Sequence, residues 1–312
     1  MSKKFKILSI DGGGIRGVFS AIILNKIEEK FNVRLNELFD LVAGTSTGSI
    51  LASAIACDIS LEEVIDLYKN EGKKIFSKRF SGTLGLFKSK YDNTELKSLL
   101  KDKFGNKTLS DSSLKTRLLI PTTDISNGDV HVIKSKYLDE FKRDPDRLIK
   151  DAVLASCSAP LYFNPTKLDN FLLADGGLWA NNPSLVALTE AVGKIKKTTE
   201  IEQITFENVK LLSIGTGIGY KYYDLSKFES DSWGFLFDWE RSKLIDTILN
   251  LQSINTHNVV SFMLPKNNYL RLNFESDRDL SLDSVKIIPF LESKAAKIFT
   301  ANSDNIKKLL EL

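Results

Sequence analysis

Residues 39–50 constrain the fold of this chain more than any other segment, because an apolar strand pattern runs there directly into an apolar helix pattern. Between the two stands the pentapeptide GTSTG, in which Gly44, Ser46 and Gly48 have the spacing of a nucleophile elbow. The two glycines of that motif leave room for a sharp strand-to-helix turn, and the serine has a strained backbone. We therefore expect Ser46 to present its hydroxyl at a helix N-terminus, where partial positive charge favours an anion. An ordinary turn can contain the same residues, so the prediction depends on the strand and helix patterns on either side.

A second strand-to-helix junction lies near the N-terminus. Residues 5–10 form a short apolar run, as in a buried parallel strand, and residues 18–27 are mostly apolar, as in a helix packed on a sheet. The heptapeptide DGGGIRG connects them at residues 11–17. Glycines before a helix let backbone N–H groups surround an anion, so the junction predicts an anion-binding loop. Arg16 within it either steadies the loop or adds positive potential, or it forms an ordinary surface salt bridge.

Two kinds of anion fit this glycine loop. The spacing G-x-G-x-x-G over residues 12–17 is formally that of a dinucleotide-binding fingerprint. Against that interpretation, the next strand lacks a final acidic residue for a ribose, and Asp11 would meet the pyrophosphate. Alternatively, the N–H groups of Gly12, Gly13 and Gly14 form a nest for the oxyanion of an acyl-transfer intermediate.

An Asp-Gly-Gly sequence follows another apolar run at residues 171–174. Side chains at the carboxyl ends of strands gather at one edge of an α/β sheet, so Asp175 is a candidate to meet Ser46. Gly176 and Gly177 complete the motif. The alternative is a simple Asp-Gly turn, which is common in loops.

A nucleophilic serine needs a proton acceptor, and the chain has only two histidines. His131 alternates with valines in an expected strand, and His257 lies inside an expected helix, so we expect both to be structural. Asp175 is then left as the direct partner of Ser46. Because a free carboxylate has a pKa of about 4 and is a weak base, we expect burial to raise the pKa of Asp175.

The remaining periodic segments alternate between strand and helix patterns, which predicts an α/β fold. We expect strands at residues 117–123, 130–135, 210–214 and 269–273, and helices at 60–76, 92–104, 148–156, from 184 onward, 241–262 and 292–310. No internal repeat or low-complexity linker interrupts the chain. We therefore expect one domain over residues 1–312, with a core at about 5–220 and a C-terminal helical and strand elaboration at about 221–312.

Composition excludes several classes of protein. The 312 residues are 42% hydrophobic and 27% charged, which suits a large globular core. The net charge of +3 is too small to predict binding of a nucleic acid polymer, but it allows weak attraction to an anionic membrane. No run approaches the roughly 20 apolar residues of a membrane span, and the first residues lack a signal-peptide pattern. Cys57 and Cys157 have neither metal-ligand spacing nor a disulfide framework, so we expect no metal and a reducing cytoplasm.

Two further segments are rich in aromatic side chains. Residues 72–90 combine them with six basic and no acidic residues, which fits either a lid or membrane-facing patch, or a solvated helix end with core anchors. Residues 222–239 contain seven aromatic residues, which either line an acyl-chain pocket or second ligand site, or pack in the core.

The chain resembles the patatin-like phospholipases. The motifs at residues 11–17, 44–48 and 175–177 stand in the order and context of that family, and weaker matches occur at 90–91, 104–105, 155–160, 182–183, 212–217 and 269–272. The resemblance implies a three-layer α/β/α hydrolase with a mostly parallel central sheet, no cofactor, and a membrane phospholipid as substrate. It also assigns roles to the motif residues: Ser46 as nucleophile, Asp175 as base, Gly12, Gly13 and Gly14 as oxyanion donors, and Arg16 as support of their loop.

The chain also resembles bacterial phospholipase effectors of antiviral signalling that cyclic di- or trinucleotides switch on. That resemblance implies a role in antiphage defence, a cyclic di- or trinucleotide activator, and a cytoplasmic protein that contacts the inner membrane peripherally when active. It allows a homo-oligomer without requiring one. Two alternatives stay open: a general lipid or ester hydrolase without nucleotide control, and a non-catalytic ligand-sensing protein on the same scaffold.

Overall fold

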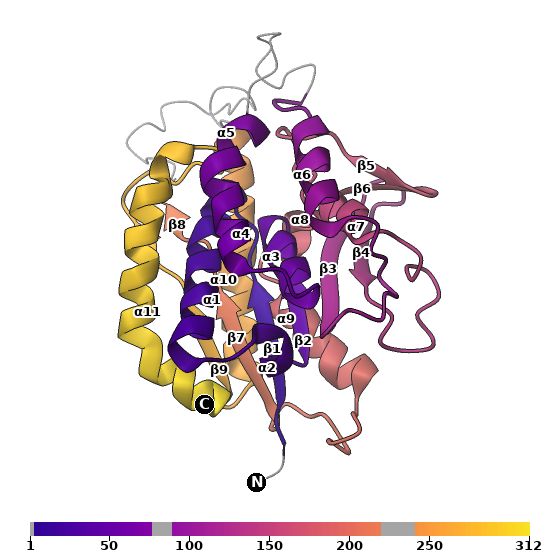
Figure 1. Cartoon of the computed structure of the whole chain (residues 1–312), viewed down its shortest axis with the longest axis vertical. Coiled ribbons are helices and arrows are strands. Elements are labelled where there is room, and N and C mark those ends of the chain that lie inside the picture. The colour runs from indigo at the N-terminus through magenta and orange to yellow at the C-terminus, as the bar shows by residue number, and fades with distance from the viewer. Residues whose placement is uncertain (1–2, 77–88, 220–240) are drawn as a thin grey trace, which may run out of the picture.

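A mostly parallel sheet forms the centre of the molecule, and helices cover both of its faces (Figure 1). The computed structural model describes residues 3–76, 89–219 and 241–312. The strands of this sheet are β1 (Phe5–Ile10), β2 (Leu41–Gly44), β3 (Arg117–Asp124), β4 (Asp129–Lys134), β5 (Thr166–Leu168), β6 (Phe171–Asp175), β7 (Val209–Ile214) and β9 (Tyr269–Leu272). A separate pair consists of β8 (Ile218–Gly219) and β10 (Glu275–Ser276).

The sheet has the strand order β5-β6-β3-β2-β1-β7-β9, and β4 pairs with β3 outside that path. Strands β3, β2, β1, β7 and β9 are parallel to their neighbours in this series. At one end, β4 and β6 run antiparallel to β3, and β5 runs antiparallel to β6. The expected three-layer α/β/α architecture with a mostly parallel central sheet is confirmed.

Helices stand between the successive parallel strands β1, β2, β3, β7 and β9 along the chain. The helices are α1 (Gly17–Phe31), α2 (Leu35–Leu38), α3 (Thr47–Ala56), α4 (Leu61–Asp66), α5 (Gly72–Ile75), α6 (Thr94–Phe104), α7 (Ile149–Ser156), α8 (Gly177–Ala180), α9 (Ser184–Glu190), α10 (Arg241–Met263) and α11 (Ile288–Leu310). Short 3₁₀ turns stand at Gly14–Arg16, Lys266–Asn268 and Val285–Ile287, and π-helical turns at Leu67–Glu71 and Ala191–Ile195.

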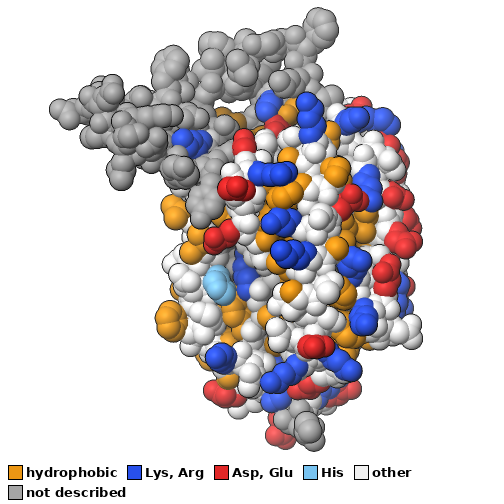
Figure 2. Space-filling view, turned by 90° about the vertical axis from the view of Figure 1, so that its left-hand side faces the viewer, with side chains coloured by type: hydrophobic (Ala, Val, Ile, Leu, Met, Phe, Trp, Pro, Cys, Tyr) orange, Lys and Arg blue, Asp and Glu red, His pale blue; other side chains and the backbone are white. Residues whose placement is uncertain are grey.

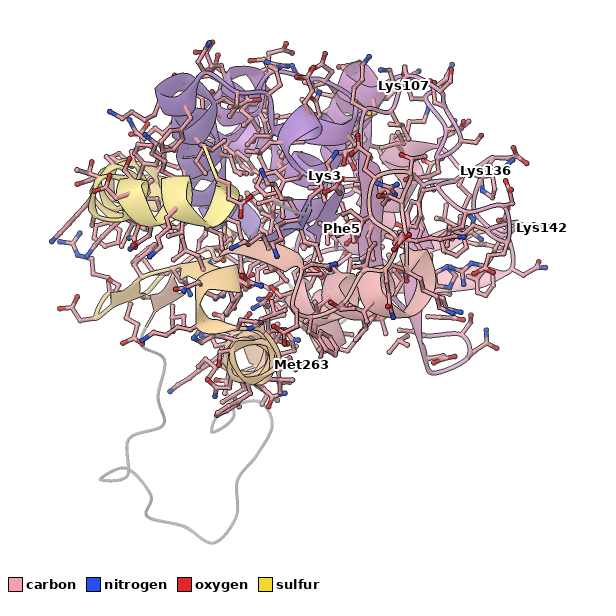
Figure 3. All side chains as sticks on the ribbon, turned by 90° about the horizontal axis from the view of Figure 1, so that it is seen from below. Lys3, Phe5, Lys107, Lys136, Lys142 and Met263 are labelled. Carbon is pink, nitrogen blue, oxygen red and sulfur yellow. The ribbon has the colours of Figure 1, made fainter. Side chains whose placement is uncertain are left out.

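Alternate residues of the central strands supply two separate hydrophobic cores. Leu8 and Val42 belong to the core shared with α1, α3, α4 and α11, whereas Ile7 and Leu41 belong to the core shared with α9 and α10. Viewed from below, the end of α10 near Met263 stands on one side of the sheet, and α1 and α11 stand on the other (Figure 3). Helices packed on both faces therefore hold the sheet, and with it the ends of its strands, in place.

The helix expected at residues 60–76 begins where predicted but is interrupted. Ser60 Oγ accepts a hydrogen bond from the backbone N–H of Glu62 at 3.2 Å and caps α4. The carboxylate of Glu63, which a capping box would use, accepts a hydrogen bond from Lys103 Nζ of α6 at 2.7 Å. The π-helical turn at Leu67–Glu71 then separates α4 from α5. Such turns often occur near functional sites.

The C-terminal region is built into the central sheet. Strand β9 pairs in parallel with β7, and α11 packs against α1. On the face that α11 covers, basic and acidic side chains are interspersed (Figure 2). The extent of the single domain, with its division near residue 220, stays a prediction.

Two expectations fall mainly outside the described residues. The basic and aromatic segment at 72–90 is described only at its two ends, and residues 222–239 lie entirely outside. Within the described parts of the chain, no helix has the length and apolar character needed to cross a membrane.

Candidate active site

Ser46 occupies a strained turn between β2 and α3. Its backbone has φ 52° and ψ −124°, a conformation that side-chain-bearing residues rarely adopt. The flanking glycines permit the turn: a Cβ at Gly44 would lie 2.1 Å from the carbonyl oxygen of Gly48, and one at Gly48 would lie 2.3 Å from that of Ile10. The strained backbone expected for a nucleophile elbow is therefore present.

Side chains of Ser156, Ser49 and Thr45 hold this turn. Ser156 Oγ, at the end of α7, accepts the backbone N–H of Ser46 at 2.9 Å and donates to the carbonyl oxygen of Pro121 in β3 at 2.7 Å. Ser49 Oγ donates to the carbonyl oxygen of Ser46 at 2.6 Å, and Thr45 Oγ1 donates to that of Ala180 at 2.6 Å. The strained turn is thus held by one local contact, from Ser49, and by contacts with Ser156 and Ala180, which are distant in sequence.

Asp175 reaches the same edge of the sheet through a strand of opposite direction. Strand β3 lies parallel to β2, with Leu119 opposite Ala43, and continues beyond the end of β2. Strand β6 runs back along this extension and places Asp175 opposite Thr122. A Cβ at Gly176 would lie 2.3 Å from the carbonyl oxygen of Pro121, so this close approach requires glycine. Asp175 therefore lies beside the elbow because β6 pairs with the part of β3 that extends beyond β2. It is not at the end of a strand parallel to β2, as the sequence had led us to expect.

Burial raises the pKa of Asp175 to about 6. The nearby Ser46 side chain and the N–H of Gly177 oppose this rise in pKa, because both stabilise the carboxylate. The Gly177 N–H donates to Asp175 Oδ1 at 2.6 Å, and a Cβ at Gly177 would stand only 3.0 Å from that oxygen. A carboxylate with this pKa is still ionised near neutral pH and is a stronger base than a free aspartate.

The glycine loop lies against the elbow, with a Cβ at Gly12 only 3.2 Å from that of Ser46. The N–H of Gly12 donates to the carbonyl oxygen of Asn181 at 3.0 Å, and the carbonyl oxygen of Gly12 accepts from Thr216 Oγ1 at 2.9 Å. The N–H groups of Gly13 and Gly14 make no hydrogen bond with any described residue. Of the three expected anion-binding glycines, Gly12 thus has its donor engaged within the protein.

Arg16 supports the loop from inside. Its side chain is buried, donates from Nε to the carbonyl oxygen of Gly13 at 3.2 Å, and donates from Nη1 to that of Gly217 at 3.3 Å. The backbone N–H of Ile15 donates to the carbonyl oxygen of Leu282 at 2.8 Å. Arg16 is thus buried rather than at the surface, and its contacts are those of a residue that steadies the loop, while its part in the site stays a prediction.

Ser46 and Asp175 both line one pocket, together with Gly13 and Gly14. The pocket has an empty volume of about 830 Å³, part of it open to solvent, and its remaining wall is mostly aliphatic and aromatic. The wall includes Ile50, Leu67, Ile75, Leu96, Phe163 and Leu249. A few polar groups in an apolar cleft are typical of a ligand site.

The other titratable candidates do not compete for the role of base or nucleophile. Burial lowers the pKa of His131 to about 4, and its ring packs 4.7 Å from that of Phe171. His257 Nδ1 lies 3.0 Å from the hydroxyl of Tyr269, and neither histidine lines the pocket that contains Ser46. Cys157 lines the pocket, but burial raises the pKa of its thiol far above the usual range and keeps it protonated.

The described residues contain no cluster of three His, Cys, Asp or Glu side chains that is suited to hold a metal ion. Sequence reasoning missed Ser156 and Asn181, which position the elbow and the glycine loop. The only sequence signal for them is their place in small or polar runs that end a helix.

The comparisons with known proteins point to one family. A family model described as patatin-like phospholipase matches residues 8–188, a range that contains the glycine loop, Ser46 and Asp175. The cGAMP-activated phospholipase of Vibrio cholerae is 29% identical over 100% of this chain and 95% of its own length. The cGAMP-activated phospholipase of Escherichia coli is 31% identical over 90% and 80%, and patatin-like protein 2 of Oryza sativa is 32% identical over 88% and 77%.

Proposed function

The chain belongs to the patatin-like phospholipase family, and from this premise we propose that it hydrolyses fatty-acyl esters of membrane phospholipids, with Ser46 as nucleophile and Asp175 as base. The observation that carries the assignment is the meeting of these two side chains in one apolar pocket. The raised pKa of Asp175, which lies near 6, supports its role as a base.

In the first half-reaction, Ser46 Oγ attacks the ester carbonyl carbon while Asp175 takes the hydroxyl proton. The carbonyl oxygen becomes an oxyanion, which the N–H groups of Gly13 and Gly14 stabilise. Gly12 contributes indirectly, because its own N–H holds the loop to Asn181. Asp175 then gives the proton to the leaving lysophospholipid oxygen as the bond to the acyl carbon breaks, which leaves an acyl-enzyme.

In the second half-reaction, Asp175 takes a proton from a water molecule that attacks the acyl carbon. The same N–H groups stabilise the second oxyanion. When the bond to Ser46 Oγ breaks, the proton returns from Asp175 to that oxygen, and the free fatty acid leaves. Each cycle consumes one water and restores both side chains.

The test is fatty-acid release from phospholipid vesicles by wild type, Ser46→Ala and Asp175→Asn, with labelling of Ser46 by a fluorophosphonate probe. Both variants should lose release, and Ser46→Ala should also lose labelling. Two matched controls are available: Ser53→Ala in the same helix, and Asp151→Asn, whose carboxyl pKa is also raised by burial. Both controls should remain active. Full release by Ser46→Ala would refute the assignment and favour a non-catalytic, ligand-sensing scaffold.

The substrate class is tested separately from the chemistry. The apolar pocket supports an acyl chain as the bound group. Activity on phospholipid vesicles well above that on short-chain aryl esters would support a phospholipase that contacts the membrane peripherally. The reverse ratio would favour a general lipid or ester hydrolase.

We extend the proposal to control by a cyclic dinucleotide, because relatives named cGAMP-activated phospholipases align with 100% and 90% of this chain. Vesicle hydrolysis should then be low without ligand and rise when cGAMP or another cyclic di- or trinucleotide is added. If no cyclic nucleotide changes the rate of hydrolysis, the proposed hydrolase activity stands. Control by a cyclic nucleotide, and with it the role in antiphage defence, is then rejected. Comparing molecular mass in solution with and without the activating nucleotide tests for a homo-oligomer.

A further inference from the structure

A buried ion pair connects the C-terminal strand β9 with the start of the glycine loop. Arg271 donates from Nη1 to Asp11 Oδ1 at 2.9 Å and from Nη2 to Asp11 Oδ2 at 2.6 Å. Only 9% of the Arg271 side chain and 3% of the Asp11 side chain are exposed. A two-pronged arginine–carboxylate contact fixes both partners in orientation as well as in distance. This pair is therefore suited to set the position of the backbone at Asp11.

The Asp11 carboxylate also takes part in a closed ring of contacts around the loop. Ser253 Oγ of α10 donates to Asp11 Oδ2 at 3.3 Å, and Asn181 Nδ2 donates to Ser253 Oγ at 2.9 Å. The carbonyl oxygen of Asn181 accepts the N–H of Gly12 at 3.0 Å, and Gly12 is bonded directly to Asp11. The ring thus fixes the peptide group between Asp11 and Gly12, which lies one residue before the N–H of Gly13.

Arg271 reaches this ring across a strand. It stands opposite Ser213 of β7, which lies between β9 and β1 in the sheet, and its Nη1 donates to Ser213 Oγ at 2.7 Å. Asp11 after β1, Asn181 after α8, and residues of β7, β9 and α10 therefore meet beneath the loop. The C-terminal region supplies two of them, Arg271 and Ser253.

The charges of Asp11 and Arg271 affect how the pocket accommodates an anion. A buried carboxylate one residue before the loop would oppose negative charge in the pocket, because electrostatic repulsion is strong where water is excluded. Arg271 pairs with that carboxylate and compensates its charge. If only one partner is removed, the other is left as an uncompensated buried charge.

We propose that Arg271 is a positioning residue of the hydrolase: through Asp11 it orients the Gly13 and Gly14 N–H groups and cancels the Asp11 charge near the oxyanion. The inference rests on the proposed function, because it presupposes acyl transfer at Ser46. It assigns to β9 and α10 a part in catalysis although neither carries a reacting group.

The test compares Arg271→Gln with the double variant Asp11→Asn/Arg271→Gln. The readouts are kcat and KM on a soluble short-chain ester and the rate of Ser46 labelling by a fluorophosphonate. Arg271→Gln should lower kcat and the labelling rate about 100-fold, as loss of an oxyanion donor does, with KM little changed. The double variant lacks the uncompensated carboxylate and should regain at least about tenfold of that loss, which is a coupling between contacting residues. A purely structural role predicts no such recovery of kcat in folded protein.

The matched control is a partly buried ion pair, Lys134 with Glu190, whose Nζ and Oε2 are 2.6 Å apart. Lys134→Met should lower thermal stability and leave the kcat of folded protein unchanged. If Arg271→Gln does not fold, Arg271→Lys is the variant to measure, because it keeps the charge and loses the two-pronged contact. A several-fold loss of kcat at constant KM in Arg271→Lys supports the inference. A kcat equal to that of wild type overturns it.

Two outcomes for the glutamine variants separate this inference from the proposed function. An active wild type combined with unchanged kcat in Arg271→Gln, or with a loss that Asp11→Asn does not relieve, overturns the inference alone. An inactive wild type that the probe does not label overturns the proposed function and the inference together.

Discussion

The side-chain oxygen of Ser156 accepts the backbone N–H of Ser46 at 2.9 Å, although the two residues lie 110 positions apart. The same hydroxyl donates to the carbonyl oxygen of Pro121 at 2.7 Å, so one buried serine joins the elbow to β3. No backbone carbonyl of the described residues accepts the N–H of Ser46, so this N–H depends on the contact with Ser156.

Ser156→Ala should therefore destabilise the protein and slow the reaction. The unpaired, part-buried N–H of Ser46 is expected to cost about 1–3 kcal/mol of unfolding free energy, and relaxation of the elbow should lower kcat. Denaturant unfolding and ester hydrolysis measure the two effects. Ser158→Ala, which loses contacts with Leu154 and Thr166 but none with the elbow, should keep its kcat. Equal kcat values for Ser156→Ala and wild type would show that the elbow does not need this support.

The pH dependence of hydrolysis follows from the base. Asp175 acts only when deprotonated, so kcat/KM should rise with pH and reach half its maximum near pH 6, where burial places its pKa. The measurement is kcat/KM from pH 4.5 to 8.5 on a substrate without titratable groups. Circular dichroism over the same range controls for unfolding. A midpoint near pH 4, as for an exposed aspartate, would contradict the assigned environment.

Asp175→Asn should abolish activity and stabilise the fold. The native pKa of about 6 exceeds the value of about 4 for an unfolded chain, so stability falls as pH rises through this interval. Above pH 6 the buried carboxylate costs up to about 3 kcal/mol, at 1.36 kcal/mol for each unit of pKa. Asparagine keeps an acceptor for the Gly177 N–H and removes the charge. Its advantage in unfolding free energy should be larger at pH 8 than at pH 5. A pH-independent difference would exclude this explanation.

Gly13→Ala should damage the glycine loop. The added Cβ would stand 2.2 Å from Thr216 Oγ1, so the loop or Thr216 must move, and Thr216 holds the Gly12 carbonyl. We expect a loss of kcat of at least about 100-fold, as for a displaced oxyanion donor. Gly193→Ala is the control, because its Cβ would enter open space. It should leave kcat unchanged and raise stability by a few tenths to about 1 kcal/mol. Wild-type kcat in Gly13→Ala would remove this glycine from the site.

Leu249→Trp should shorten the acyl chain that the pocket accepts. Leu249 lines the pocket from α10 and is 9% exposed, so a larger side chain fills part of the cleft. The ratio of activity on long-chain to short-chain esters should fall, while labelling by a small fluorophosphonate persists. Leu251→Trp on the same helix is the control, since Leu251 is 60% exposed and does not line the pocket. A parallel loss on all chain lengths in Leu249→Trp would indicate misfolding instead.

Periodic and local patterns were sufficient to predict the architecture. Apolar runs before glycine-rich turns predicted β1, β2, β6 and β7 within about one residue of their observed ends, because a buried parallel strand and its turn are encoded by neighbouring residues. The positive φ of Ser46 and its supporting glycines were predictable for the same reason. The length of the helix from Ser60 was not, because a π-helical turn interrupts it at Leu67–Glu71.

The contacts that complete the candidate site were decided only by the tertiary structure. Asp175 lies beside the elbow because β6 runs antiparallel along the part of β3 that extends beyond β2. An apolar run in the sequence does not reveal the direction in which its strand will pair. Arg16 is buried beneath the loop, and Arg271 pairs with Asp11 over a separation of 260 residues. A lone arginine or serine has no period or neighbour that reveals its partner. In this protein the sequence alone determined the strands, the turns and the reactive residue types, and packing across the sheet determined which distant side chains hold them in place.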